Sequence, residues 1–239
     1  MPNSSALWRS GRRGYLRTKL AFLLLSGCVS ATAAEIEITP ITHASVQLAY
    51  NGKVIQVDPV QDGQKADLIV ITGPEADHLN PAAIAKLRKP GAPVVIPEAA
   101  KDKVPDGIVL ANGESKEVAG IRVEAVAAYD LIPGDPFHPK GRGNGYVIIF
   151  GGKRIFFSGV GECVPEVQAL KNIDIAFVSM NLPHGRMTME SAAACMQTFH
   201  PAIVYPYHYR TGKVEDFKRL LDGKGIEVRL ANWYPASPK

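Results

Sequence analysis

Carboxylates and imidazoles follow several apolar runs of this sequence, and these residue types could bind a metal ion. Glu75, Asp77 and His78 stand in the stretch ITGPEADHLNP, directly after an apolar run. Asp130 follows VEAVAAY, and His208 follows IVYPY. Polar residues at the ends of strands are common site residues in α/β folds. Oxygen and nitrogen ligands of this kind suit zinc, manganese or iron.

The elements that must position these residues can be predicted from turn signals and from the spacing of apolar residues. Asn51-Gly52 separates two strand-like runs and is a strong hairpin signal. Asn80 and Pro81 predict a helix start, because asparagine caps helices and proline fits their first position. Strands are expected at 46–50, 53–58, 66–72, 92–97, 121–129, 145–150, 153–159, 173–180, 202–209 and 226–231, and helices at 81–88, 188–199 and 214–223. This order predicts an α/β fold in which two mixed sheets pack face to face with helices outside, an αββα sandwich.

The first 34 residues have the composition of an export leader. They contain no acidic residue, and their basic residues are Arg9, Arg12, Arg13, Arg17 and Lys19. The apolar segment at 20–34 is too short to span a membrane and fits the core of a signal peptide. We therefore expect residues 1–34 to be a signal peptide or lipoprotein leader and residues 35–239 to form a single domain. The protein is expected in the periplasm or cell envelope.

The route of export is left open by three short patterns. LLSGC resembles a lipoprotein box, which would place a lipid on Cys28 and anchor the protein to the membrane. ATA, ending at Ala33, offers the small residues of ordinary signal cleavage. Arg12 and Arg13 resemble a twin-arginine signal. A lipid on Cys28 is the membrane contact that these patterns predict.

The charge of the chain argues against nucleic acid as a partner. The sequence has 27 basic and 23 acidic residues, a net charge of +4. Without the five basic residues of the leader, 22 basic residues stand against 23 acidic ones, so the remainder is near −1. A nucleic-acid-binding domain usually has a basic excess. We expect a small anionic molecule as the partner instead.

Two cysteines remain after the leader. Cys195 lies in the apolar, helix-like run SAAACMQTF and reads as a small core residue. Cys163 follows a predicted strand, where it or Glu162 could substitute for a metal ligand. The two could also form a disulfide in an oxidising compartment.

The chain from about Ile36 to Trp233 resembles the metallo-β-lactamase-fold hydrolases, in particular the branch related to ascorbate-6-phosphate lactonase. The resemblance is carried by ITHASVQLAYNGKVIQVDP, ADLIVITGPEADHLNP, FHPKGRGNGYVI, GGKRIFFSGVGE, IDIAFVSMNLPHGRMTMESAA and PAIVYPYHY. It implies two metal ions held by a loop of the form T-H-x-H-x-D-H, a later histidine, a bridging aspartate and a final histidine. Such a centre activates water for attack on an ester, lactone, amide or phosphodiester.

At some of the family's ligand positions, this sequence has residues that can bind a metal. Asp77 and His78 match the end of the loop motif, and His208 matches the final histidine. The later histidine position falls near Asp130. Three protein ligands with an open position are typical of a catalytic metal, and zinc is the first expectation, with manganese or iron as alternatives.

Three other ligand positions of the family are altered. Gly73 and Glu75 stand where the loop carries its first two histidines, and Val160 stands at the bridging aspartate. Glycine and valine offer no side-chain ligand, and without a bridging carboxylate two divalent cations repel each other. The sequence therefore predicts one metal ion and disfavours a dinuclear centre.

Three hypotheses fit this altered motif. In the first, the protein hydrolyses a small anionic ester, lactone or phosphoester with one metal held by Asp77, His78 and His208. Asp77 is then a ligand or base, and Glu75 and Asp130 are auxiliary ligands or orient water. In the second, it is a catalytically inactive envelope binding protein. In the third, Asp77 and His78 only hold their loop by hydrogen bonds.

Two basic segments could bind the anionic substrate. FHPKGRGNGY contains His138, Lys140 and Arg142 among three glycines and resembles a substrate-side loop that could attract phosphate or carboxylate. His184 precedes the helix expected from Thr188, a position that also favours an anion. His43 in ITHAS approaches the pocket in the family that the chain resembles.

Overall fold

The computed structural model describes residues 35–132, 134, 136–180, 187–210 and 212–234 of the 239-residue chain. The predicted leader, with Cys28, Ala33 and the arginine pair, lies outside the described residues, and so does His184. Ala34–Lys239 form one compact unit. None of the described helices has the length and apolarity that crossing a membrane requires.

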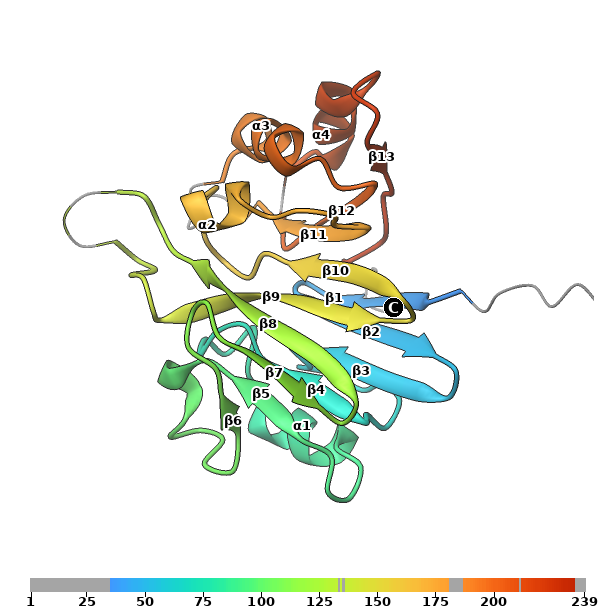
Figure 1. Cartoon of the computed structure of the whole chain (residues 1–239), viewed down its shortest axis with the longest axis vertical. Helices are drawn as coiled ribbons and strands as arrows, with labels where there is room; N and C mark the ends of the chain where they lie inside the picture. Colours follow the sequence, from blue (N-terminus) through green and yellow to red (C-terminus); the bar gives the residue numbers. More distant parts are fainter. Residues whose placement is uncertain (1–34, 133, 135, 181–186, 211, 235–239) are drawn as a thin grey trace, which may run out of the picture. The chain divides into compact units, whose positions relative to one another are not determined.

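The first sheet contains the N-terminal half of the described chain (Figure 1). Its six strands lie in chain order: β1 (Glu37–Thr42), β2 (Ser45–Tyr50), β3 (Lys53–Val57), β4 (Leu68–Val70), β5 (Val94–Ile96) and β6 (Ile108–Val109). The first three pair antiparallel, and β3 to β6 are parallel. The turn between β2 and β3 confirms the predicted hairpin, because Asn51 and Gly52 both have the positive φ of a type I′ turn.

The second sheet is also mixed and contains the C-terminal half. Its order is β13-β12-β11-β10-β9-β8-β7, with β7 (Ser115–Val118), β8 (Ile121–Ala128), β9 (Gly143–Phe150), β10 (Lys153–Phe157), β11 (Ile175–Ser179), β12 (Ile203–Tyr207) and β13 (Glu227–Val228). The strands from β7 to β10 pair antiparallel, and those from β10 to β13 are parallel. The C-terminal ends of β10, β11 and β12 therefore lie at the same edge of the sheet.

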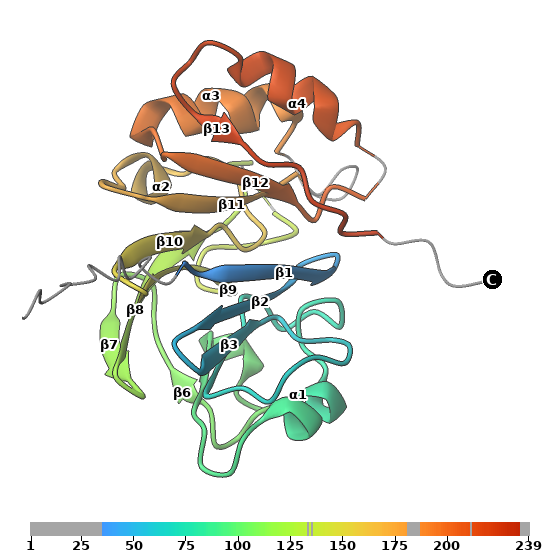
Figure 2. The same ribbon diagram turned by 90° about the vertical axis from the view of Figure 1, so that its right-hand side faces the viewer.

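Helices cover the outer faces of both sheets (Figure 2). They are α1 (Pro81–Leu87), α2 (Pro165–Gln168), α3 (Met189–Phe199) and α4 (Val214–Leu221), with a 3₁₀ turn at Glu98–Ala100. Asn80 caps α1 by accepting from two backbone N–H groups, and Thr188 Oγ1 accepts from Ser191 N at 3.1 Å. Both predicted helix starts are confirmed.

Three apolar clusters separate these layers. The largest lies between the sheets and joins Leu48 and Ile55 of the first sheet to Tyr146 and Phe157 of the second. A second cluster packs α2, α3 and α4 on the outer face of the second sheet, and a third packs α1 on the first. Burial of these side chains drives the layers together, and the predicted αββα sandwich is confirmed.

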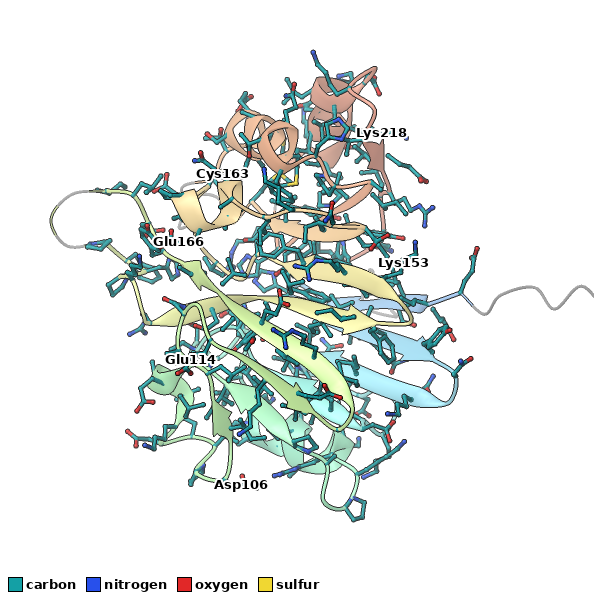
Figure 3. All side chains as sticks on the ribbon, viewed as in Figure 1. Asp106, Glu114, Lys153, Cys163, Glu166 and Lys218 are labelled. Carbon is teal, nitrogen blue, oxygen red and sulfur yellow. A yellow bond between two sulfur atoms is a disulfide. The ribbon has the colours of Figure 1, made fainter. Side chains whose placement is uncertain are left out.

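A disulfide joins Cys163, in the loop after β10, to Cys195 in α3 (Figure 3). Their Cα atoms are 5.7 Å apart, and the bond spans 32 residues of sequence. Cys195 thus belongs to the core of α3 and to the disulfide at once. Because Cys163 is bonded to Cys195, it is not a substitute metal ligand, and that alternative was wrong.

We expect the double substitution Cys163→Ala and Cys195→Ala to lower the free energy of unfolding by about 3–4 kcal/mol, since the crosslink restricts a loop of this length in the unfolded chain. Urea unfolding of the oxidised protein and of the double variant measures this difference. The wild type in excess dithiothreitol is the matched control and should unfold near the variant. Equal midpoints with and without reductant would show that the bond contributes nothing.

Candidate metal centre

A fully buried carboxylate, Asp58, organises one side of the candidate site. It follows β3 with a φ of 45° and accepts hydrogen bonds through both oxygens. Oδ1 accepts from Thr72 N at 2.7 Å, and Oδ2 accepts from Thr72 Oγ1 at 2.5 Å and from His78 Nδ1 at 2.8 Å. These contacts join the end of β3 to the loop that carries His78. The sequence signal was a carboxylate at the end of a buried strand, in QVDP, and the sequence analysis did not assign it to the site.

The bond to Asp58 sets the proton positions of His78. A carboxylate accepts, so Nδ1 carries a proton and Nε2 is the nitrogen left to bind another group. Burial opposes the charged ring, but the nearby Asp58 carboxylate outweighs it, and the pKa of His78 is raised. Its ring also stacks on His208, with the centroids 4.9 Å apart.

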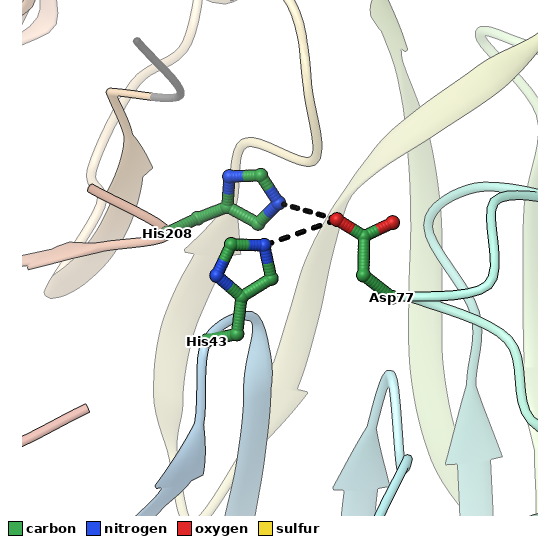
Figure 4. Close-up of side chains that lie close together, drawn as sticks. All are labelled: His43, Asp77 and His208. Carbon is green, nitrogen blue, oxygen red and sulfur yellow. Dashed lines mark hydrogen bonds and ion pairs between the residues drawn. The ribbon is translucent and has the colours of Figure 1, made fainter. Parts of the chain in front are cut away.

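His43, Asp77 and His208 form the metal-ligand cluster that the structure brings together (Figure 4). His43 lies in the turn between β1 and β2, Asp77 in the loop before α1, and His208 directly after β12. One ligand atom of each lies within 4.8 Å of the others. Asp77 Oδ2 is 3.0 Å from His43 Nε2 and 3.6 Å from His208 Nε2. Both histidines have a φ of 52°, and His208 N donates to His43 O at 3.1 Å, which ties the two turns together.

His208 is the residue of the cluster whose state is most unusual. Both of its ring nitrogens are buried and have no hydrogen bond within 3.5 Å among the described residues, and the nearest group to Nε2 is Asp77 Oδ2 at 3.6 Å. A buried polar group without a partner is costly and rare. Burial, together with the nearby His78 and His43, lowers the pKa of His208 to about 3. The ring is therefore neutral at pH 7 and has a lone pair to offer.

Asp77 is surrounded by cationic and hydrogen-bonding groups. The imidazoles of His208 and His43 hold its pKa far below the ordinary value of an aspartate, although burial opposes this. Arg210 Nη2 lies 3.2 Å from the same Oδ2 oxygen. Asp77 is therefore anionic over the whole physiological range of pH.

The Tyr234 hydroxyl is a hydrogen-bond partner of His43 Nδ1. It accepts from Arg210 N at 2.9 Å and lies 2.7 Å from His43 Nδ1. If its proton goes to Nδ1, the proton of His43 is on Nε2 and points at Asp77. This assignment satisfies both ring nitrogens. Arg210 and Tyr234 were missed by the sequence analysis, because neither belongs to a recognisable motif.

The donor set of this cluster fits a single metal ion. Two imidazoles and a carboxylate are the protein ligands of many catalytic zinc sites and of non-haem iron sites. His208 Nε2, which faces Asp77, is the buried nitrogen that a metal would satisfy. The predicted ligands Asp77 and His208 are in this cluster, with His43 as the third member, while His78 lies beside it against the ring of His208.

Of the remaining predicted residues, Glu75, His138 and Arg142 line a small pocket. Glu75 accepts from Arg142 Nε at 2.8 Å, and Gly73 and Val160 line the same pocket. Within the part of the chain that the structure describes, the ligand cluster contains neither Glu75 nor Asp130.

Asp130 and Lys140 are engaged with other partners. Asp130 Oδ2 accepts from His138 N at 2.9 Å, and Oδ1 lies 3.4 Å from His138 Nδ1. Lys140 donates to Glu166 and lies 5.1 Å from the centroid of the Tyr129 ring. Of the predicted substrate loop, His138 and Arg142 therefore line the pocket and Lys140 lies outside it.

Comparison with known proteins adds four findings. Residues 37–208 match the family described as "Beta-lactamase superfamily domain". A UPF0173 metal-dependent hydrolase of Aeropyrum pernix is 28% identical over 223 residues, covering 81% of this chain and 92% of the relative. A solved structure from Parabacteroides distasonis, named provisionally as a metal-dependent hydrolase, is 40% identical with a TM-score of 0.80, covering 84% of this chain and 94% of that one. Igni18, a metallo hydrolase of Ignicoccus hospitalis, is 20% identical with a TM-score of 0.67 and covers 82% and 94%, which shows the shared fold.

Replacing Asp58 by Asn is expected to destabilise the protein by about 3 kcal/mol, because it removes one partner of a buried ionic hydrogen bond. The pKa of His78 should fall at the same time. Urea unfolding and an NMR titration of the His78 ring measure the two effects. Asp62→Asn is the matched control, because Asp62 forms an exposed ion pair with Lys86 and its loss should change stability by less than about 1 kcal/mol. An unchanged His78 titration in Asp58→Asn would contradict this account.

The depressed pKa of His208 predicts an acid-sensitive stability in the metal-free protein. Below pH 6.5 the unfolded chain takes up a proton at His208, whereas the folded chain does not until about pH 3. The free energy of unfolding therefore decreases as the pH is lowered, by about 2 kcal/mol from pH 6.5 to pH 4.5. His208→Asn, which tolerates the left-handed backbone, should remove that part of the slope. Urea unfolding of both proteins in chelator, at several pH values, tests it, and parallel slopes would refute it.

Proposed function

The chain belongs to the β-lactamase superfamily domain family, and from its site we propose that it is a hydrolase that works with one divalent metal ion. His43, Asp77 and His208 would hold the ion. The observation that carries this proposal is the buried imidazole of His208, whose two nitrogens lack hydrogen-bond partners among the described residues beside an anionic Asp77. Zinc is the expected metal, and manganese and iron have the same kinds of ligand.

A bound metal would polarise a carbonyl or phosphoryl group and lower the pKa of water. The residues of the chain supply the rest. Asp77 provides the negative charge that attracts the cation. His43 can bind through Nε2 once its proton moves to Nδ1, where it would donate to the Tyr234 hydroxyl. Arg210, beside Asp77, places a positive charge at the edge of the site.

The substrate that suits this site is a small anionic ester, lactone or phosphoester. Arg142 lines the pocket and Arg210 contacts Asp77 of the ligand cluster, and guanidinium groups pair well with carboxylate and phosphate. The finer resemblance to ascorbate-6-phosphate lactonase agrees with such a substrate and stays a prediction. So does the role of His78 as a ligand through Nε2.

A non-catalytic binding protein is the second candidate. It is favoured by the contacts of Asp77, whose Oδ2 already interacts with His43 Nε2 and with Arg210 Nη2. A carboxylate satisfied in this way can hold its loop without a metal. In that case the same pocket binds an anion and catalyses no reaction.

Export to the periplasm or cell envelope is also part of this proposal. The Cys163–Cys195 disulfide supports it, because disulfides persist mainly in oxidising compartments. A cell fractionation that finds the mature protein in the reducing cytosol would contradict it.

Elemental analysis of the mature protein, purified without chelator and offered zinc, manganese or iron in turn, should find about one metal per chain. His208→Asn and His43→Asn should each weaken binding tenfold or more, because each removes one of three ligands. His78→Asn decides whether His78 is a further ligand. His200→Asn is the matched control, since His200 is bonded to Lys224 O, away from the site, and has a left-handed backbone like His208. No metal under any supplement would favour the binding protein.

A further inference from the structure

The pocket beside the ligand cluster contains an internal ion pair. Its lining residues are Thr72, Gly73, Glu75, His138, Arg142, Gly143 and Val160. Arg142 Nε donates to Glu75 Oε1 at 2.8 Å. The cluster of His43, Asp77 and His208 is the one group of potential metal ligands found among the described residues, and it does not include the pocket. The positively charged group that lines this pocket is the Arg142 guanidinium.

Gly73 makes room for this ion pair. A Cβ atom at position 73 would lie 2.5 Å from Glu75 Oε2, far inside van der Waals contact. The Glu75 carboxylate thus occupies the space in which a side chain at position 73 would begin. A larger residue there would require the end of the Glu75 side chain to shift. The Glu75 carboxylate of the ion pair therefore uses space that glycine at position 73 leaves empty.

Val160 also lines the pocket and offers no side-chain atom that can bind a metal. Its side chain is apolar, and the residue lies in the loop that follows β10. A divalent cation at this place would meet the fixed charge of Arg142 and a single carboxylate that is already paired. Coulomb repulsion and the shortage of donors both oppose it.

The guanidinium keeps part of its binding capacity. Of its three nitrogens, only Nε has a hydrogen-bond partner among the residues that the structure describes, and the Arg142 side chain is 45% exposed. The bond to Glu75 engages the Nε side of the group. The two terminal nitrogens can then bind an oxyanion in the fork geometry typical of arginine.

We propose that the Glu75–Arg142 pair takes the place of a second metal ion and that Arg142 binds the anionic group of the substrate, a carboxylate or a phosphate, beside the single metal. Glu75 is then a positioning residue for Arg142 rather than a metal ligand. The proposal deepens the proposed function and rests on it for the neighbouring metal. Anion binding by Arg142 itself does not require that metal.

The test is an anion titration of the mature protein in the metal-free state. Inorganic phosphate and acetate are added separately at constant ionic strength, and binding is followed by NMR of the arginine Nε–H signals. We expect the Arg142 signal, identified by its loss in Arg142→Met, to shift and saturate. Saturation at a lower concentration of phosphate than of acetate identifies a phosphate site, and the reverse order identifies a carboxylate site.

Arg142→Met should weaken anion binding at least tenfold, since it removes charge-assisted hydrogen bonds, and binding by this variant is followed through the backbone amides of the pocket. Arg142→Lys keeps the charge but not the fork and should have intermediate affinity. Lys140→Met is the matched control, because Lys140 belongs to the same loop and is paired with Glu166 outside the pocket. Its anion affinity should equal that of the wild type. Thermal unfolding of each variant shows that it is folded.

Two outcomes would overturn the proposal: equal anion affinity in Arg142→Met and wild type, or a wild type that binds two metal ions per chain. An absence of metal with intact anion binding at Arg142 would refute the single-metal hydrolase while leaving the anion site in place. The two proposals can therefore fail separately.

Discussion

The hydrogen bonds of the buried Asp58 carboxylate are the constraint on which the arrangement of the site depends. A charged group without access to water is tolerated only when hydrogen bonds or an opposite charge replace its hydration. Asp58 obtains both from Thr72 and His78, which lie fourteen and twenty residues further along the chain. The end of β3, the end of the β4 run and the loop with Asp77 are thereby held in one arrangement. The left-handed backbone of Asp58 is sustained by the same contacts.

The two halves of the site differ in their chemistry. One half keeps a carboxylate and imidazoles at the distances and burial that a metal ligand set needs. The other half contains Gly73, Glu75, Arg142 and Val160, which together make an ion pair and an apolar wall. A metal ion and a guanidinium both offer positive charge, but the guanidinium offers it permanently and with directional N–H groups. Under the two proposals, the first half would activate a bond and the second would orient an anion.

The loops that carry these groups are stabilised from several sides. His43 N donates to Trp233 O and Tyr234 contacts His43, so the C-terminal segment that follows β13 supports the turn between β1 and β2. The Cys163–Cys195 disulfide ties the loop after Val160 to α3. Glu162 Oε2 accepts from Leu131 N and joins that loop to the segment after β8. Each contact links residues that are distant in sequence, as expected for a site built from loops at the edges of two sheets.

The sequence by itself determined the layers of the fold and pointed to Asp77 and His208, two of the three residues of the ligand cluster. Apolar periodicity, the Asn51-Gly52 turn and the caps at Asn80 and Thr188 act over a few residues, so they located the strands and helices. The order of these elements then predicted the sandwich. β1 and β7 were missed, since EITPIT contains a proline and SKEV is largely polar, as edge strands often are. The loss of ligands at Gly73 and Val160 was also legible, because glycine and valine have no ligand atom.

Only the tertiary structure decided which groups meet. It paired Cys163 with Cys195, placed Arg142 against Glu75 and turned Asp130 toward His138. It also brought His43 and Arg210 to Asp77, and Tyr234 to His43. These partners come from different elements, and their distances depend on how the two sheets and the loops pack. Sequence patterns record local propensity and residue chemistry, whereas the burial that shifts the pKa of His208 and leaves its ring nitrogens without partners arises when the whole fold closes around it.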